Sequence, residues 1–151
     1  MILNGAGVVL AGAIPDSMAL AERLDAPVCV GYQHNDAFPG SHPLFAGPLG
    51  YNGSKAAMEL IKEADVVLCL GTRLNPFSRL PDYGMEYWPT EAKIIQVDIN
   101  PDRIGLTKKV TVGIVGDAAK VLGISVRTLR NKLHEYRQTP RGGQATGSQV
   151  A

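Results

Sequence analysis

The residues best suited to chemistry lie near the end of the chain, in the stretch AAKVLGISVRTLRNKLHEY from Ala118 to Tyr136. Ala119 and Gly123 are four residues apart, as expected where the two helices of a helix-turn-helix touch and turn. Arginine reads guanine and asparagine reads adenine in the DNA major groove. The stretch therefore predicts a DNA-binding helix-turn-helix. Its expected DNA-binding residues, the first of them also a helix cap, are Ser125, Arg127, Thr128, Arg130, Asn131 and Lys132.

The same stretch has a simpler interpretation. Its apolar residues could belong to an amphipathic terminal helix that packs on the preceding domain and presents its charges to water. On either interpretation the inward-facing residues are the same. They are Leu122, Ile124, Leu129 and Leu133.

A second candidate for chemistry is the glycine pair Gly5 and Gly7 in NGAG, at the end of the first apolar run. Glycines at this place would let a ligand phosphate approach the backbone closely. The alternative is a tight turn with no ligand. An ordinary NAD site is not expected, because GAGVVL lacks the third glycine of the dinucleotide fingerprint and no acidic residue ends the second strand.

Short apolar runs alternate with helical patterns along most of the chain, which predicts an α/β fold with a parallel sheet covered on both faces. The expected strands are residues 1–5, 27–31, 65–71, 93–100 and 109–117, and the expected helices are residues 14–25 and 54–64. Two long connections, residues 32–52 and 72–90, each follow a strand. Ligands of open α/β sheets bind at that edge, so both connections are functional candidates.

The composition, with 45% hydrophobic and 19% charged residues in 151, is typical of a globular protein. Acidic residues outnumber basic ones in residues 1–116, whereas residues 117–151 are basic, which suggests an anionic partner for the second part alone. Cys29 and Cys69 each lie in an apolar run and are expected to be buried thiols. No run is long enough to span a bilayer, and we expect a cytoplasmic protein without a membrane partner.

Several ordered motifs resemble the central domain of thiamine-diphosphate-dependent enzymes of the acetolactate synthase group, with the sulfoacetaldehyde acetyltransferases as the nearest branch. The motifs are NGAGVVLAGAIPDSMALAERLDAPV, FPGSHPLFAGPLGYNGSKAA, LGTRLNPFS and IIQVDINPDRIG. The resemblance implies a Rossmann-like domain of three layers with a parallel sheet. It also implies an ADP or FAD site in those relatives that bind one. Its residues here would be Gly5, Gly7, Gly71, Thr72, Arg73, Asp98 and Asn100.

In such a site Arg73 and the backbone amides would meet phosphate, and Asp98 would accept hydrogen bonds from ribose hydroxyls. A helix cap or a surface ion pair is the alternative role for Asp98. Thiamine diphosphate and Mg²⁺ are implied for the family only. Members of the family bind them with an upstream glutamate and a downstream GDG…N segment. The nearest match to that segment here, GDAAK at Gly116, differs at its third position. We therefore expect no catalytic residue and no metal ligand here, and no activity of the chain alone.

The tail stretch resembles the Fis-type helix-turn-helix of bacterial enhancer-binding activators, and the two resemblances overlap at GDAAKV. The expected organisation is a truncated central domain (residues 1–116), a helix-turn-helix (residues 117–137) and a disordered tail (residues 138–151). Three hypotheses stay open at this point: a chimera whose tail binds DNA, an enzyme fragment that needs separate subunits, and a product without selected function. The expected partners are DNA, a second copy in a homodimer, or the missing enzyme domains.

Overall fold

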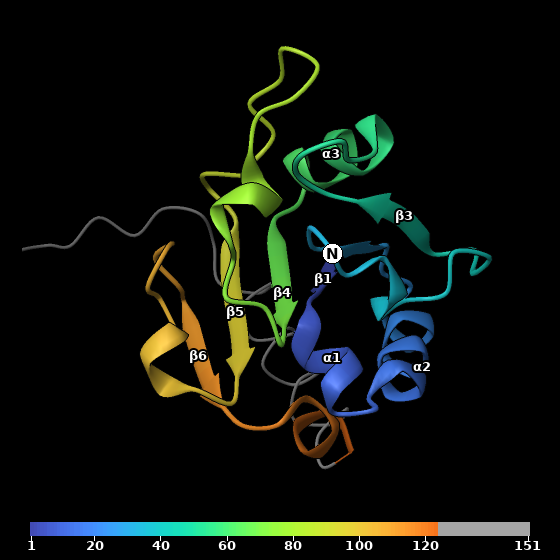
Figure 1. The fold of residues 1–151 in the computed structure, drawn as a ribbon, viewed down its shortest axis with the longest axis vertical. Helices are drawn as coiled ribbons and strands as arrows, with labels where there is room; N and C mark the ends of the chain where they lie inside the picture. Colours follow the sequence, from blue (N-terminus) through green and yellow to red (C-terminus); the bar gives the residue numbers. More distant parts are fainter. Residues whose placement is uncertain (124–151) are drawn as a thin grey trace, which may run out of the picture.

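The computed structural model describes residues 1–123, which form one six-stranded parallel sheet in the order β3-β2-β1-β4-β5-β6 (Figure 1). The strands are β1 (Ile2–Asn4), β2 (Val28–Val30), β3 (Phe45–Pro48), β4 (Val66–Leu70), β5 (Lys93–Asp98) and β6 (Val112–Val115). The α-helices are α1 (Ala6–Leu10), α2 (Ile14–Leu24) and α3 (Lys55–Lys62), and residues 118–123 are also helical. Three short 3₁₀ helices are η1 (Asn35–Ala37), η2 (Pro76–Arg79) and η3 (Pro101–Arg103).

Both faces of the sheet are buried, as the near-continuous apolar strands predict. One face packs against α1, α2 and the helical residues 118–123, and its core includes Val8, Leu20 and Leu68. The other face packs against α3 and the segment between β4 and β5, with Met58 and Tyr87 in its core. The expected three-layer parallel α/β architecture is therefore confirmed.

Two elements differ from the sequence-based expectation. β3 lies inside the connection that we expected to be a loop, because FAGP contains a glycine and a proline and gives no strand pattern by itself. It forms only through pairing with β2, where the register shifts between Val28 and Cys29. α1 has five residues, too few for a helical period to be visible in the sequence.

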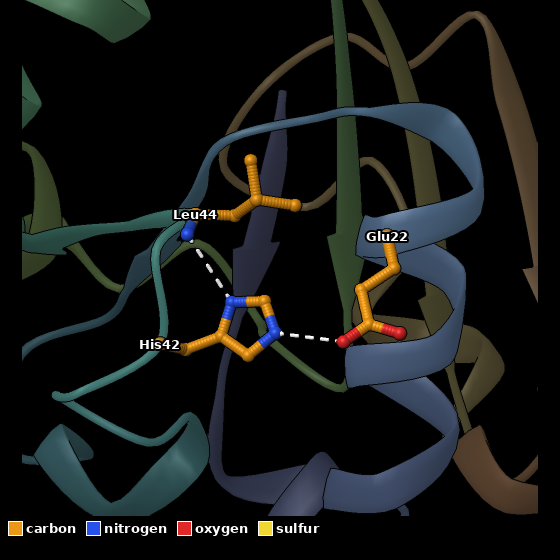
Figure 2. A network of polar contacts seen from close by, with 3 residues as sticks. All are labelled: Glu22, His42 and Leu44. Carbon is orange, nitrogen blue, oxygen red and sulfur yellow. Dashed lines mark hydrogen bonds and ion pairs between the residues drawn. The ribbon is translucent and has the colours of Figure 1, made fainter.

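The segment that enters β3 is tied to α2 by His42 (Figure 2). Its Nδ1 accepts a hydrogen bond from the Leu44 amide at 3.2 Å, and its Nε2 lies 3.1 Å from a carboxylate oxygen of Glu22. Because Nδ1 acts as an acceptor, the ring carries its hydrogen on Nε2 and donates it to Glu22. These two contacts anchor the entry to a strand that has only one neighbour in the sheet.

Both cysteines are free and buried, as expected. Burial raises the pKa of Cys29 and of Cys69 to about 12, because a thiolate would lose its hydration inside the core. At neutral pH both are therefore thiols that serve as packing residues. Among residues 1–123, no helix is long and apolar enough to cross a membrane.

The chain after β6 enters a helix at residue 118, and its first turn belongs to the α/β core. Ala118 and Leu122 are 4% and 2% exposed and pack in the same cluster as α1 and α2. Leu122, expected as an inward residue of the helix-turn-helix, thus faces the sheet domain. The predicted DNA-binding residues Ser125 to Lys132 and the predicted tail lie outside the described residues.

Leu122→Ala tests this placement. Because the substitution removes a fully packed side chain from the core, it should lower the free energy of unfolding of the domain by about 2–5 kcal/mol. The neighbouring Lys120 is exposed, so Lys120→Ala should change stability by less than about 0.5 kcal/mol. Urea unfolding of both variants is the measurement. Equal stability of the two would mean that Leu122 does not pack on the sheet.

Candidate functional site

The candidate site lies at the carboxyl edge of the sheet, between β1 and β4. The strand order runs outward from β1 to β3 and resumes on the other side of β1 at β4, so this is the point where dinucleotides bind in related open sheets. The sequence places Gly5 and Gly7 after β1, and Gly71, Thr72 and Arg73 after β4. The structure brings these two turns together.

The two turns cross in direct backbone contact, here called the glycine crossing (Gly5, Gly7 and Gly71). A Cβ atom on Gly7 would lie 2.6 Å from the Gly71 Cα atom, and one on Gly71 would lie 2.5 Å from the Gly7 Cα atom. Gly71 also has a φ of +57°, which favours glycine. Three glycines are therefore required by the approach of one backbone to another.

The amides of the glycine crossing are all engaged. The Gly5 amide donates to the Leu70 carbonyl at 2.9 Å, the Gly7 amide to the Gly71 carbonyl at 2.9 Å, and the Gly71 amide to the Val97 carbonyl at 2.8 Å. An amide has one hydrogen to donate. The amides of Gly5, Gly7 and Gly71 are therefore not available to a ligand phosphate, which is a role that the family resemblance implied for them.

Thr72 and Arg73 have different surroundings. Thr72 is buried, and its hydroxyl accepts a hydrogen bond from the Leu74 amide at 3.2 Å, so it stabilises the turn. Arg73 is exposed and has no salt bridge among residues 1–123. Of the predicted nucleotide contacts, Arg73 is therefore the one whose charge is available to an anion.

Asp98 and Asn100 act as local caps at the end of β5. The Asp98 carboxylate accepts from the Asn100 amide at 2.9 Å, and the Asn100 side-chain carbonyl accepts from the Asp102 amide at 2.9 Å. Asp98 is 5% exposed. Asn100 is thus the cap of η3, while one Asp98 carboxylate oxygen holds the Asn100 amide just before the helix begins.

Gln96, in the middle of β5, joins the loops of this edge and was missed by the sequence analysis. Its side-chain amide donates to the Thr72 carbonyl at 3.0 Å and to the Arg103 carbonyl at 3.2 Å, while its carbonyl accepts from the Gly105 amide at 2.9 Å. Gln96 is 1% exposed. A lone polar residue in the apolar run KIIQVDIN was the available signal, since buried amides need partners.

A separate surface is formed by aromatic residues at the ends of β2, β3 and β4, and we call Tyr32, Tyr51, Phe77 and Tyr83 the aromatic surface. The Tyr32 and Phe77 rings stack with centroids 5.7 Å apart, and the Tyr32 and Tyr51 rings meet edge to face at 6.3 Å. A groove of about 270 Å³ adjoins them. Its lining residues are Tyr32, Gln33, Asn35, Pro48, Leu49, Tyr51 and Asn52.

A metal site is not built by this part of the chain. In residues 1–123 there is no group of three or more His, Cys, Asp or Glu side chains that could hold a metal ion. Within the described residues there is therefore no all-protein metal cluster of the kind that binds Zn²⁺ or Ca²⁺.

A family model described as "Thiamine pyrophosphate enzyme, central domain" matches residues 1–123. The match extends past the boundary expected at residue 116 and includes the helical turn that carries Leu122. The packing of Leu122 and the extent of the family match therefore both include residues beyond the boundary expected at residue 116.

The chain is also similar to longer curated proteins. It is 79% identical over 121 residues to a sulfoacetaldehyde acetyltransferase of Rhodobacter capsulatus, which covers 80% of this chain and 20% of that protein. It is 40% identical over 122 residues to a probable acetolactate synthase large subunit of Methanocaldococcus jannaschii, covering 81% and 20%. The chain spans about a fifth of the length of these relatives.

Solved structures show the same fold. A benzoylformate decarboxylase of Polynucleobacter necessarius matches with a TM-score of 0.63 and 26% identity, over 84% of this chain and 23% of that one. A thiamine diphosphate-dependent 4-hydroxybenzoylformate decarboxylase of Rhodococcus jostii matches with a TM-score of 0.66 and 23% identity, over 85% and 24%. The second likeness is evidence of fold alone.

Gly7→Ala tests the glycine crossing, because the contact and helix propensity predict opposite changes in the free energy of unfolding. Helix propensity alone would make alanine stabilising by up to about 1 kcal/mol at this helical position. The contact with Gly71 should instead lower the free energy of unfolding by about 2–3 kcal/mol, because backbone cannot move aside as a side chain can. Gly40→Ala is the matched control, since its new Cβ would meet only Phe45 ring atoms at 3.8 Å or more. A stabilised Gly7→Ala protein in urea unfolding would contradict the crossing.

Proposed function

The chain belongs to the thiamine pyrophosphate enzyme central-domain family, and from this premise we propose that it serves as the non-catalytic central domain of a sulfoacetaldehyde acetyltransferase-like enzyme. The observation that carries the proposal is the 79% identity over 121 residues to the Rhodobacter capsulatus enzyme. Catalytic groups come from the remainder of the enzyme, on the same polypeptide or on separate subunits. The role of this domain is to position them.

The geometry of the carboxyl edge supports a structural role. The glycine crossing packs the turns after β1 and β4 directly against each other, and Asn100 caps η3. Gln96 fastens the neighbouring loops to the sheet. These are contacts that make a rigid domain, and none of them presents a nucleophile or a general base.

In the proposed enzyme, thiamine diphosphate with Mg²⁺ would supply the carbanion chemistry. No catalytic step is assigned to the described residues, among which no cluster of three or more metal-binding side chains is found. The ADP or FAD site inferred from the family resemblance is disfavoured here by the engaged amides of Gly5, Gly7 and Gly71. Exposed Arg73 alone is a weak anion site, because water screens a single surface charge.

The predicted DNA-binding activity is a separate matter. It rests on Ser125, Arg127, Asn131 and their neighbours, which lie outside the described residues, and none of the matched families or relatives supports it. It stays a prediction from the sequence motif. The enzyme-domain role has the stronger support, since it rests on most of the chain.

A domain graft tests the proposed function. Residues 1–123 replace the matching segment in the Rhodobacter capsulatus sulfoacetaldehyde acetyltransferase, and consumption of sulfoacetaldehyde is measured with thiamine diphosphate and Mg²⁺. We expect turnover within about tenfold of the parent enzyme, since most residues that face the other domains are shared at 79% identity.

Two controls accompany the graft. The 151-residue chain alone should show no turnover, and the parent enzyme with the same segment deleted should show none. A graft that is soluble and cooperatively folded but inactive would rule out the proposed role.

A further inference from the structure

The aromatic surface exposes large rings to water. Tyr51 is 57% exposed, Phe77 53% and Tyr83 57%, and Leu80 beside them is also exposed. Proteins that act as monomers rarely expose contiguous apolar patches of this kind unless they bind something. From its composition, rigidity and place in the fold, we propose that the aromatic surface is where this domain contacts the catalytic part of the enzyme. The proposal rests on the proposed function and names the contact surface for it.

The rings form one surface although three connections supply them. Tyr32 follows β2, Tyr51 follows β3, and Phe77 lies in η2 after β4. The stacked pair Tyr32–Phe77 and the edge-to-face pair Tyr32–Tyr51 link all three. Aromatic pairs in such geometries attract each other beyond simple burial. The surface is therefore a single cluster rather than scattered apolar side chains.

Backbone contacts hold the three connections in fixed positions. The Tyr51 amide donates to the Phe77 carbonyl at 3.0 Å, and the Tyr32 amide donates to the Ser78 hydroxyl at 2.9 Å. A side chain at Gly50 would overlap the Phe77 backbone, so the second and third connections touch directly. Rings that are already ordered lose little entropy on binding. Rigid, outward-facing rings are what a docking surface requires.

Tyr83 extends the surface along the segment between β4 and β5, which projects beyond the sheet in Figure 1. Its hydroxyl donates to the Gly53 carbonyl at 3.0 Å, which fastens the projecting turn to the connection after β3. Tyr83 has a φ of +53°, which is unusual for a residue with a side chain. The turn therefore holds an aromatic ring at its tip in a conformation that the hydroxyl contact helps to maintain.

The chemistry of the surface fits a protein partner. The four rings and the groove beside them include Pro48, Leu49 and three carboxamides, and no charged side chain lines the groove. Cores of protein interfaces are enriched in aromatic residues and depleted in charge. The carboxamides of Gln33, Asn35 and Asn52 can satisfy backbone groups of a partner at the rim.

The partner of the aromatic surface is inferred from the size of the proteins that contain the matching segment. The matched segment makes up 20% of the Rhodobacter capsulatus enzyme, so most of that enzyme lies outside it. A domain of this size must bury surface against so large a remainder if it is to position catalytic groups. Within residues 1–123, three rings of the aromatic surface are in mutual contact, and the other pairs of rings involve Phe38, which is buried.

Hydroxyl-radical footprinting tests the proposal directly. The 151-residue chain and the active graft are oxidised side by side, and modification of Tyr51, Phe77 and Tyr83 is measured by mass spectrometry. We expect about a tenfold lower rate at these residues in the graft, because they enter the water-excluded core of an interface. Tyr87, which is 1% exposed, should react slowly in both and reports that the domain is folded.

Substitution gives a second readout. The double variant Tyr51→Ser/Phe77→Ser removes two rings that pair with Tyr32, so the isolated chain should stay cooperatively folded with its free energy of unfolding lowered by about 1–3 kcal/mol. The turnover of the graft should fall by about tenfold or more. Leu10→Ser is the matched control. Leu10 is 86% exposed and lies at the end of α1, outside the aromatic surface, so its substitution should leave the turnover of the graft unchanged.

The outcomes separate the two proposals. The proposed interface is rejected if the graft is active but Tyr51 and Phe77 are oxidised as fast as in the isolated chain. It is also rejected if the double variant of the graft keeps full turnover. In both cases the proposed function stands. Protection already present in the isolated chain, together with sedimentation as a dimer, would assign the surface to a second copy and also overturn the interface. An inactive graft removes the proposed function and this inference with it.

Discussion

The close contact of two backbones at the glycine crossing is the constraint on which the rest of the domain depends. Gly5 and Gly7 meet Gly71 with no room for a Cβ atom. Amide hydrogen bonds join Gly5 to Leu70 of β4, Gly71 to Val97 of β5, and Gly7 to Gly71 within the crossing. The contact fixes where α1 begins and how closely the β1 turn lies to the β4 turn. It lies at the switch point of the sheet, the place where open α/β folds bind ligands.

The two sides of the carboxyl edge differ in how their polar groups are used. On the β5 side, Gln96 binds three backbone groups and Asp98 and Asn100 serve as caps, so the polar residues there are used within the domain. On the β2 and β3 side, the polar contacts instead hold aromatic rings toward water. On the β5 side, the polar groups thus find their partners within the domain. On the β2 and β3 side, exposed rings are available for the proposed contact with the rest of the enzyme.

The boundary between the domain and the following residues has a physical reason. Leu122 completes the core above α1 and α2, so a chain ending at residue 116 would leave that core partly open. The string GDAAKV serves both resemblances because a short amphipathic turn with small residues can begin either a packed helix or a helix-turn-helix. Packing on the sheet decides the role of its first turn, and the family match to residue 123 agrees.

The sequence by itself determined the α/β class, the strands from β1 to β6 other than β3, and the family, because apolar runs, helical periods and ordered motifs are local properties. It also placed the buried cysteines. Only the tertiary structure decided that FAGP is a strand, since its pairing with β2 comes from a distant segment. The same holds for the glycines and for Gln96. Their residue types allowed a phosphate site or an unpaired buried amide. Contacts with distant segments decided otherwise, because Gly7 meets Gly71 and Gln96 donates to the Thr72 carbonyl.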